Sequence, residues 1–151
     1  MKPNAAKPIA RVTPDEGYRL EEQVGYILRQ ASQRHAAIFA ARIPEQLTTT
    51  QFATLVRLQE VGPCSQNQLG RLTAMDAATI KGVTDRLIQR GFVEAKVDPE
   101  DGRRRMLALT PAGLDAVARA IPAGLEISAE TLEPLSAEER AQFMALLKKL
   151  R

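Results

Sequence analysis

Apolar side chains recur at helical spacing over much of the chain, at intervals of three and four residues. We expect a first long helix over residues 18–42 that ends before Pro44. Its apolar stripe consists of Leu20, Val24, Ile27, Leu28, Ala31, Ile38 and Phe39. Similar spacing predicts helices over residues 49–61, 66–72 and 77–90. Phe52, Leu55, Val56 and Leu58 are the core candidates of residues 49–61, which end at Gly62-Pro63.

Helix starts are marked by Ser or Thr followed three residues later by Glu or Gln. This pattern satisfies backbone N–H groups that a helix start leaves unpaired. It occurs at Thr13/Glu16, Thr48/Gln51, Ser65/Gln68 and Ser136/Glu139. Asp76 is a further N-cap candidate, before residue 77. These signals fix the boundaries of most predicted helices.

The pattern changes to two short β-rich runs after Gly91. The runs cover residues 92–97 and 103–109, and Pro, Asp and Gly between them predict a β-hairpin. Thr110-Pro111 restarts a helix, which Pro122 should kink or break. A last helix over 136–150 carries an apolar stripe of Phe143, Leu146, Leu147 and Leu150. Amphipathic helices at both ends of the chain suggest packing against a second copy; the alternative is that both cover their own core.

Composition favours helices and narrows the function. The chain has 151 residues, of which 44% are hydrophobic and 4% aromatic, with no Trp. We therefore expect a mainly α fold with a small β-hairpin. With one His and one Cys, no phosphate-cradling glycine loop and no recognisable nucleophile, we expect no enzyme, no metal and no cofactor. Cys64 is the only cysteine, so no intramolecular disulfide can form. The sequence shows no signal peptide and no apolar run long enough to cross a membrane. We therefore expect a cytoplasmic protein without a membrane partner.

Two helices joined by a tight turn and followed by a charged hairpin form the plan of a winged helix-turn-helix. Its second helix, the reader helix, fits the major groove of duplex DNA. Here residues 77–90 would be the reader helix. Ile80, Val83, Leu87 and Ile88 should face the core, and Ala77, Ala78, Lys81, Thr84 and Asp85 should point outward. Ala78 or Thr79 can contact a thymine methyl, and Lys81 can reach guanine or phosphate; the alternative is an ordinary solvated helix face.

Three successive arginines, Arg103, Arg104 and Arg105, stand at the tip of the predicted hairpin. Alternation in a strand would place Arg103 and Arg105 on one face and Arg104 on the other. We expect Asp101 to orient the Arg103 guanidinium toward a narrow minor groove, the alternative being a solvated charged turn. The net charge is only +3, but the sequence pI near 9.3 and the surplus of Arg over Lys keep nucleic acid among the candidate partners. The predicted DNA-contacting residues are Ser65, Gln66, Asp76, Ala77, Ala78, Thr79, Lys81, Thr84, Arg86, Arg103, Arg104 and Arg105.

Residues 76–113 resemble the signature stretch of the MarR family. The matching motifs are Asp85-Arg86-Leu87, Arg90-Gly91, Phe92-Val93-Glu94, Asp101-x-Arg103 and Leu109-Thr110-Pro111-x-Gly113. Gly82 departs from the pattern, because many members carry a larger, often basic residue there. The resemblance implies a homodimer that binds a pseudo-palindromic DNA operator and is released by a small effector. Residues 1–12 carry Lys2, Lys7 and Arg11 and two prolines without helical periodicity, which predicts a flexible basic arm. The remaining residues, 13–151, would form a single MarR-like domain, with dimerisation helices in 13–47 and 111–151 and the winged helix-turn-helix lobe in 48–110.

A closer resemblance is to the branch of the family that represses catabolism of aromatic acids. The segments Gln33-Arg34-His35-Ala36-Ala37-Ile38-Phe39 and Cys64-Ser65-Gln66-Asn67-Gln68-Leu69-Gly70 carry it. It implies an aromatic acid or its coenzyme A thioester, such as a hydroxycinnamoyl-CoA, as the effector. The implied effector-binding residues are Arg11, Tyr26, Arg29, Arg34, His35, Phe39, Arg42 and Phe52. For His35 the alternative is a hydrogen-bonded histidine at the dimer boundary.

Two other functions fit parts of the sequence. Cys64 can serve as a redox sensor in such a repressor, although its sequence neighbours supply no positive charge to activate the thiol. A winged helix can also act as a protein-interaction adaptor, against which the three arginines argue. We therefore expect a sequence-specific transcriptional repressor that a small effector releases from its operator.

Overall fold

The computed structural model describes residues 17–151 and divides the chain into two compact units, Met1–Arg34 and His35–Arg151. In the first unit a 3-10 helix, η2 (Leu20–Glu22), precedes the start of α1 (Val24–Arg42). The prediction of one helix from residue 18 is therefore wrong at its start. Gln23 has an extended backbone, and its side-chain amide donates to the Arg19 carbonyl at 3.0 Å, which ends the 3-10 turn. The predicted capping pair Thr13/Glu16 lies outside the described residues.

In the second unit, the helices of the predicted lobe are α2 (Thr49–Val61), α3 (Gln66–Leu72) and α4 (Ala77–Gln89). Before them lies the 3-10 turn η3 (Pro44–Gln46). Thr48 and Gln51 form the predicted capping box at the start of α2, and Ser136 and Glu139 form another farther along the chain. Ser65 accepts from the Gln68 backbone N–H. The boundaries of α2 and α3 confirm the predictions, because these caps are local properties of the sequence.

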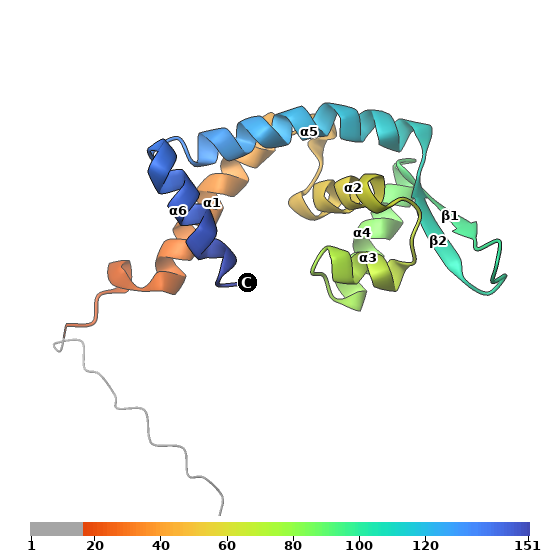
Figure 1. Cartoon of the computed structure of the whole chain (residues 1–151), viewed down its shortest axis with the longest axis horizontal. Helices are drawn as coiled ribbons and strands as arrows, with labels where there is room; N and C mark the ends of the chain where they lie inside the picture. Colours follow the sequence, from red (N-terminus) through yellow and green to blue (C-terminus); the bar gives the residue numbers. More distant parts are fainter. Residues whose placement is uncertain (1–16) are drawn as a thin grey trace, which may run out of the picture. The chain divides into compact units, whose positions relative to one another are not determined.

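The hairpin consists of β1 (Val93–Val97) and β2 (Arg105–Leu109), paired antiparallel with Val93 opposite Leu109. Cys64 adds an isolated bridge to β2 through backbone hydrogen bonds with Leu107 of 3.1 and 2.8 Å. This bridge ties the segment before α3 to the middle of β2. Figure 1 shows the hairpin beside α2, α3 and α4, at the end of the second unit where α5 begins.

The second unit closes with α5 (Pro111–Thr131) and α6 (Ala137–Lys148). Pro122 lies inside α5, which continues through it, so the prediction of a break is wrong. Proline removes one backbone donor, but packing against α2 and η3 holds the helix together. Figure 1 shows α5 running along α2 from the hairpin to the turn before α6. Among the described residues, no helix is long and apolar enough to cross a membrane.

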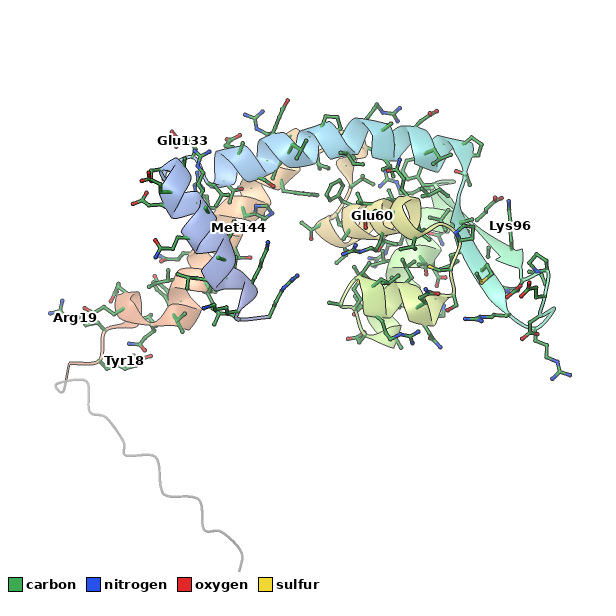
Figure 2. All side chains as sticks on the ribbon, viewed as in Figure 1. Tyr18, Arg19, Glu60, Lys96, Glu133 and Met144 are labelled. Atoms are coloured by element: carbon green, nitrogen blue, oxygen red, sulfur yellow. The ribbon has the colours of Figure 1, made fainter. Side chains whose placement is uncertain are left out.

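The core of the second unit lies between α2, α3, α4, the hairpin and α5. Leu55, Leu69, Ile80, Leu87 and Val117 are fully buried in it. Phe52 and Val56 are half-buried against this cluster, whereas Thr54 and Gln51, which the apolar pattern did not mark, are buried. α6 ends at Lys148, two residues before the predicted end, and the apolar stripe remains uncovered: Phe143, Leu146 and Leu147 of α6 and Leu150 beyond it are 38–72% exposed. Figure 2 shows side chains of α6, with Met144 labelled.

Candidate nucleic-acid interface

The turn between α3 and α4 brings the two helices into close contact. Met75 donates a backbone hydrogen bond to the Gly70 carbonyl at 2.9 Å. A Cβ on Gly70 would lie 3.1 Å from the Met75 carbonyl oxygen and 3.2 Å from Ile80 Cγ2. Glycine therefore permits the close approach that sets α4 across α3, as a helix-turn-helix requires.

One face of α4 packs into the core and the opposite face is exposed. Ile80, Val83 and Leu87 are buried, as predicted. Two assignments are wrong. Thr84 was expected to point outward but is 1% exposed, because its hydroxyl donates to the Ile80 carbonyl at 2.9 Å and can turn toward the interior. Ile88 was expected in the core but is 39% exposed, since it lies beyond the edge of the buried stripe.

The exposed face of α4 carries small and charged side chains. Ala77, Ala78, Thr79, Lys81 and Arg86 are all exposed. Lys81 Nζ lies 2.6 Å from Asp85 Oδ2, in an ion pair between two exposed side chains. The first turn of α4 therefore presents only short side chains. Lys81 is the only positive charge on this face of α4 before Arg86, and it is paired with Asp85 of the same helix.

Asp76 caps the first turn of α4. Its Oδ1 accepts from the Thr79 backbone N–H at 2.7 Å. Hydrogen bonds from the backbone and side chain of Thr79, and from the Ala78 backbone, lower the pKa of this exposed carboxyl group. Asp76 therefore fixes the start of the candidate reader helix, and its carboxylate is already engaged by that helix.

The three arginines lie at the junction of turn and strand, which corrects the expected alternation. β2 begins at Arg105, so Arg103 and Arg104 belong to the turn. Asp101 does not hold the Arg103 guanidinium as predicted; its Oδ1 accepts from the Arg103 backbone N–H at 3.1 Å. The turn needs this bond because Arg103 has no partner strand residue there. The three side chains are exposed.

A hollow of about 490 Å³ joins the arginine turn to the start of α3. Its lining consists of Ser65, Gln66, Asn67, Arg71, Arg103, Arg104 and Arg105. Ser65 and Gln66 were predicted, whereas Asn67 and Arg71 were missed. Their spacing of four residues on one short helix was the available signal, since it places both on one face. The hollow carries four guanidinium groups and no carboxylate, which suits it to phosphate.

The hairpin strands add a second charged pair beside this surface. Lys96 Nζ lies 2.7 Å from Glu94 Oε1, two residues away on β1. Figure 2 shows Lys96 projecting from β1. Lys96 is thus a positive charge of the hairpin that is internally neutralised, unlike the lining of the hollow.

The candidate effector residues fall into both units. In the second unit His35 Nδ1 lies 2.9 Å from Thr131 Oγ1, and the Phe39 and Phe52 rings meet edge to face with centroids 6.0 Å apart. Arg42 pairs with Glu130 and lies 3.6 Å from Glu126. In the first unit the Arg29 guanidinium lies 5.4 Å from the centroid of the Tyr26 ring, and Arg34 lies on α1. Arg11 lies outside the described residues.

Cys64 is poorly placed for reaction with an oxidant. Its side chain is 2% exposed, and burial raises the pKa of the thiol. The thiolate is the reactive form, and burial in an apolar setting disfavours it. Within the described residues, no cluster of three His, Cys, Asp or Glu side chains can hold a metal ion.

The packed α3–α4 pair and its basic hairpin define a winged helix-turn-helix DNA-binding protein. The MarR family model matches residues 47–104. The chain is 42% identical over 134 residues to the HTH-type transcriptional repressor NicR of Pseudomonas putida. The aligned region covers 88% of this chain and 85% of NicR. The chain belongs to the MarR family of transcriptional regulators, which are DNA-binding proteins and not enzymes.

Solved structures agree with this assignment. A probable transcriptional regulator from Pseudomonas aeruginosa is 54% identical, with a TM-score of 0.86, and the match covers 88% of this chain and all (100%) of that one. BpsR of Bordetella bronchiseptica, whose DNA binding is regulated by 6-hydroxynicotinic acid, is 40% identical with a TM-score of 0.82, covering 88% of this chain and 96% of that one.

Proposed function

We propose that this protein is a homodimeric repressor that binds a pseudo-palindromic operator and is released by an aromatic acid. Residues 48–110 form its DNA-binding lobe, and helices within 13–47 and 111–151 form the dimer. The observation that carries the DNA-binding part is the hollow between the start of α3 and the arginine turn, with its four guanidinium groups. Asn67 and Arg71 of this lining also border a smaller hollow with Ala77 at the start of α4, so phosphate contacts and groove contacts can be made together.

The uncovered apolar stripe along α6 and just beyond it supports the dimer. Phe143, Leu146, Leu147 and Leu150 recur at intervals of three and four residues and remain exposed. A second copy that covers this stripe would remove apolar surface from water. Two copies then present two α4 helices, and a twofold axis gives the operator its pseudo-palindromic form.

Salt dependence of DNA binding tests the interface. The probe is the sequence selected by the protein from a randomised duplex pool, compared with an unrelated duplex. Arg103→Ala should weaken binding to both duplexes and reduce the salt slope by about two for the dimer, because each of its two lobes loses one phosphate contact and with it the release of about 0.9 counterions. Lys81→Ala should also relax sequence preference. Equal losses on both duplexes for Lys81→Ala would remove its base-reading role.

Lys96→Ala is the matched control on the same hairpin. It also removes one positive charge, but that charge is already paired with Glu94. Its effect on the salt slope should be smaller than that of Arg103→Ala. Binding that is weak on every duplex and independent of salt would support an adaptor in place of a DNA-binding repressor.

The aromatic side chains of the second unit support an aromatic effector. Phe39 and Phe52 pack against each other, and His35 lies beside Phe39 with ring centroids 6.3 Å apart. Relatives point to the same chemistry, since 6-hydroxynicotinic acid regulates DNA binding by BpsR. Arg42 pairs with Glu126 and Glu130, so coenzyme A phosphates would compete with two carboxylates for its guanidinium group. These contacts favour the free acid over the thioester.

A thermal-shift panel tests the effector. The panel contains 6-hydroxynicotinic acid, benzoic acid and a hydroxycinnamoyl-CoA. A ligand of the folded protein raises the melting temperature, and a true effector also lowers DNA affinity because it prefers the state that does not bind DNA. We expect the free acids to do both and His35→Ala to reduce both effects. A response to the thioester alone would overturn the choice of a free acid.

A further inference from the structure

Asp85 places a negative charge on the face of α4 that is proposed to meet DNA. Ala78, Gly82 and Asp85 are separated by four and three residues, so they share one line along α4, opposite the buried Ile80 and Leu87. A Cβ added at Gly82 would meet no atom within 4 Å. The helix therefore presents a bare backbone between a methyl group and a carboxylate, and Asp85 is the longest side chain on that line.

The Asp85 carboxylate is repelled by phosphate, so a favourable contact with DNA requires a hydrogen-bond donor on a base. The Lys81 ammonium lies 2.6 Å away and neutralises it in part, but both side chains remain half-exposed or more. On the floor of the major groove the available donors are the exocyclic amines of cytosine and adenine. An ionised Asp accepts hydrogen bonds and donates none, so it suits such an amine.

Lys81 adds the complementary half of this recognition surface. An ammonium group has three N–H donors, and the ion pair with Asp85 occupies one of them. Two remain beside the free oxygen of the carboxylate. A G·C pair presents two acceptors, guanine N7 and O6, next to one donor, cytosine N4. An A·T pair alternates acceptor, donor and acceptor, which matches the pair of side chains less well.

We propose that Asp85 is a specificity-determining residue and that the Lys81–Asp85 pair reads one G·C base pair in each half-site, with the carboxylate accepting from cytosine N4. The pair also lowers affinity for other sequences, because at any other base pair the ammonium and the carboxylate cannot both find their full set of partners, and an unmatched carboxylate is repelled in a polyanionic groove. This inference rests on the proposed function, in which α4 enters the major groove.

Binding-site selection from a randomised duplex pool tests the inference with the full chain. The wild-type protein should select an invariant G·C pair in each half-site. Asp85→Ala should lose about tenfold of the discrimination at that base pair and keep it elsewhere. Asp85→Asn should move the preference at the same position toward A·T, because an amide can bond adenine N6 and N7 together.

Asp115→Ala is the matched control for charge. Asp115 is exposed on α5 and its removal changes the net charge by the same amount. Both variants should bind unrelated DNA more tightly, but Asp115→Ala should leave base preference unchanged. Thermal unfolding confirms that all variants are folded, as expected for exposed positions.

The outcomes separate this inference from the function on which it rests. If the wild-type protein selects no sequence, the proposed operator binding itself fails. If it selects a sequence and Asp85→Ala retains every base preference, the role of Asp85 is overturned while the function stands. In a double-mutant cycle, additive effects of Lys81→Ala and Asp85→Ala on G·C discrimination would overturn the joint reading by the pair.

Discussion

Arg90, the residue that ends α4, donates a hydrogen bond from its guanidinium to the backbone carbonyl of Glu45 in η3. Glu45 and the next residue, Gln46, both have positive φ, of 60° and 49°. Residues other than glycine disfavour this left-handed conformation by about 1–2 kcal/mol each. Arg90 thus holds a strained connection between α1 and α2 against the end of the candidate reader helix.

The same connection is held from a second side. The Glu45 carboxylate pairs with Arg119 Nη2 of α5 at 2.5 Å. Arg90 also donates to Gln51 Oε1 at 3.3 Å, the atom that caps the Thr48 N–H, and stacks over Phe92 at 4.8 Å from the ring centroid. Four segments therefore meet at one guanidinium group.

Replacement of Arg90 by Ala should lower the free energy of unfolding by about 1–2 kcal/mol, since hydrogen bonds to a charged donor and a ring contact are lost at a partly exposed site. Urea unfolding of the two proteins measures the difference. Arg104→Ala, at the exposed turn, is the control and should change stability by less than about 0.5 kcal/mol. Equal effects of the two variants would contradict the role of Arg90.

Gly113 and Gly82 should respond oppositely to Ala. A Cβ at Gly113 would lie 2.0 Å from the Phe92 carbonyl oxygen, which is backbone and cannot move aside, so Gly113→Ala should destabilise by about 3 kcal/mol or more. Gly82 lies in a helix with open space around it, so Gly82→Ala should stabilise by about 0.5–1 kcal/mol. If the melting temperatures of Gly113→Ala and Gly82→Ala shifted in the same direction from the wild type, the contacts described at these two glycines would be contradicted.

Asp76 should make stability depend on pH in the acid range. Its pKa is lowered in the folded protein, so its contribution is present above the ordinary carboxyl pKa of about 3.9 and is lost as the pH falls through the lowered value. Asp76→Ala should therefore destabilise at pH 7, and the difference should shrink in acid. Asp76→Asn keeps an acceptor without this titration. Unfolding measured between pH 2 and 7, in steps of about one unit, checks the trend; a constant difference would oppose it.

Cys64 should stay unreactive while the protein is folded. Burial raises the pKa of the thiol, so its contribution to stability is full below the ordinary thiol pKa of about 8.5 and is lost as the pH rises through the raised value. Compared with Cys64→Ala, the wild-type protein should lose stability above that pH. Alkylation by iodoacetamide should require unfolding. Rapid alkylation at pH 7, with DNA binding lost in the wild type and kept in Cys64→Ala, would instead support redox sensing.

Local signals allowed much of the lobe to be predicted. Thr48, Ser65 and Asp76 cap α2, α3 and α4 as the sequence indicates, because an N-cap depends on neighbours within three residues. The hairpin and the helix start at Thr110 follow from turn residues in the same way. These features need no knowledge of distant contacts.

The errors lie where distant or competing contacts decide. Thr84 is polar, yet a hydrogen bond to its own helix makes burial acceptable. Pro122 is retained within α5 because tertiary packing outweighs one missing backbone bond. The spacing of Asn67 and Arg71 places both on one face of α3, but only the tertiary fold brings that face to the same hollow as the arginine turn.

The length of α5 has a mechanical implication. Its 21 residues form a rod about 31 Å long, which starts where Thr110 joins the hairpin and ends at Thr131 beside His35. If α5 moves as one body about its histidine end, a small tilt there becomes a larger displacement of the arginine turn at the other end. Under the proposed function, an aromatic acid bound beside His35 would therefore act on the hairpin through α5 without touching it.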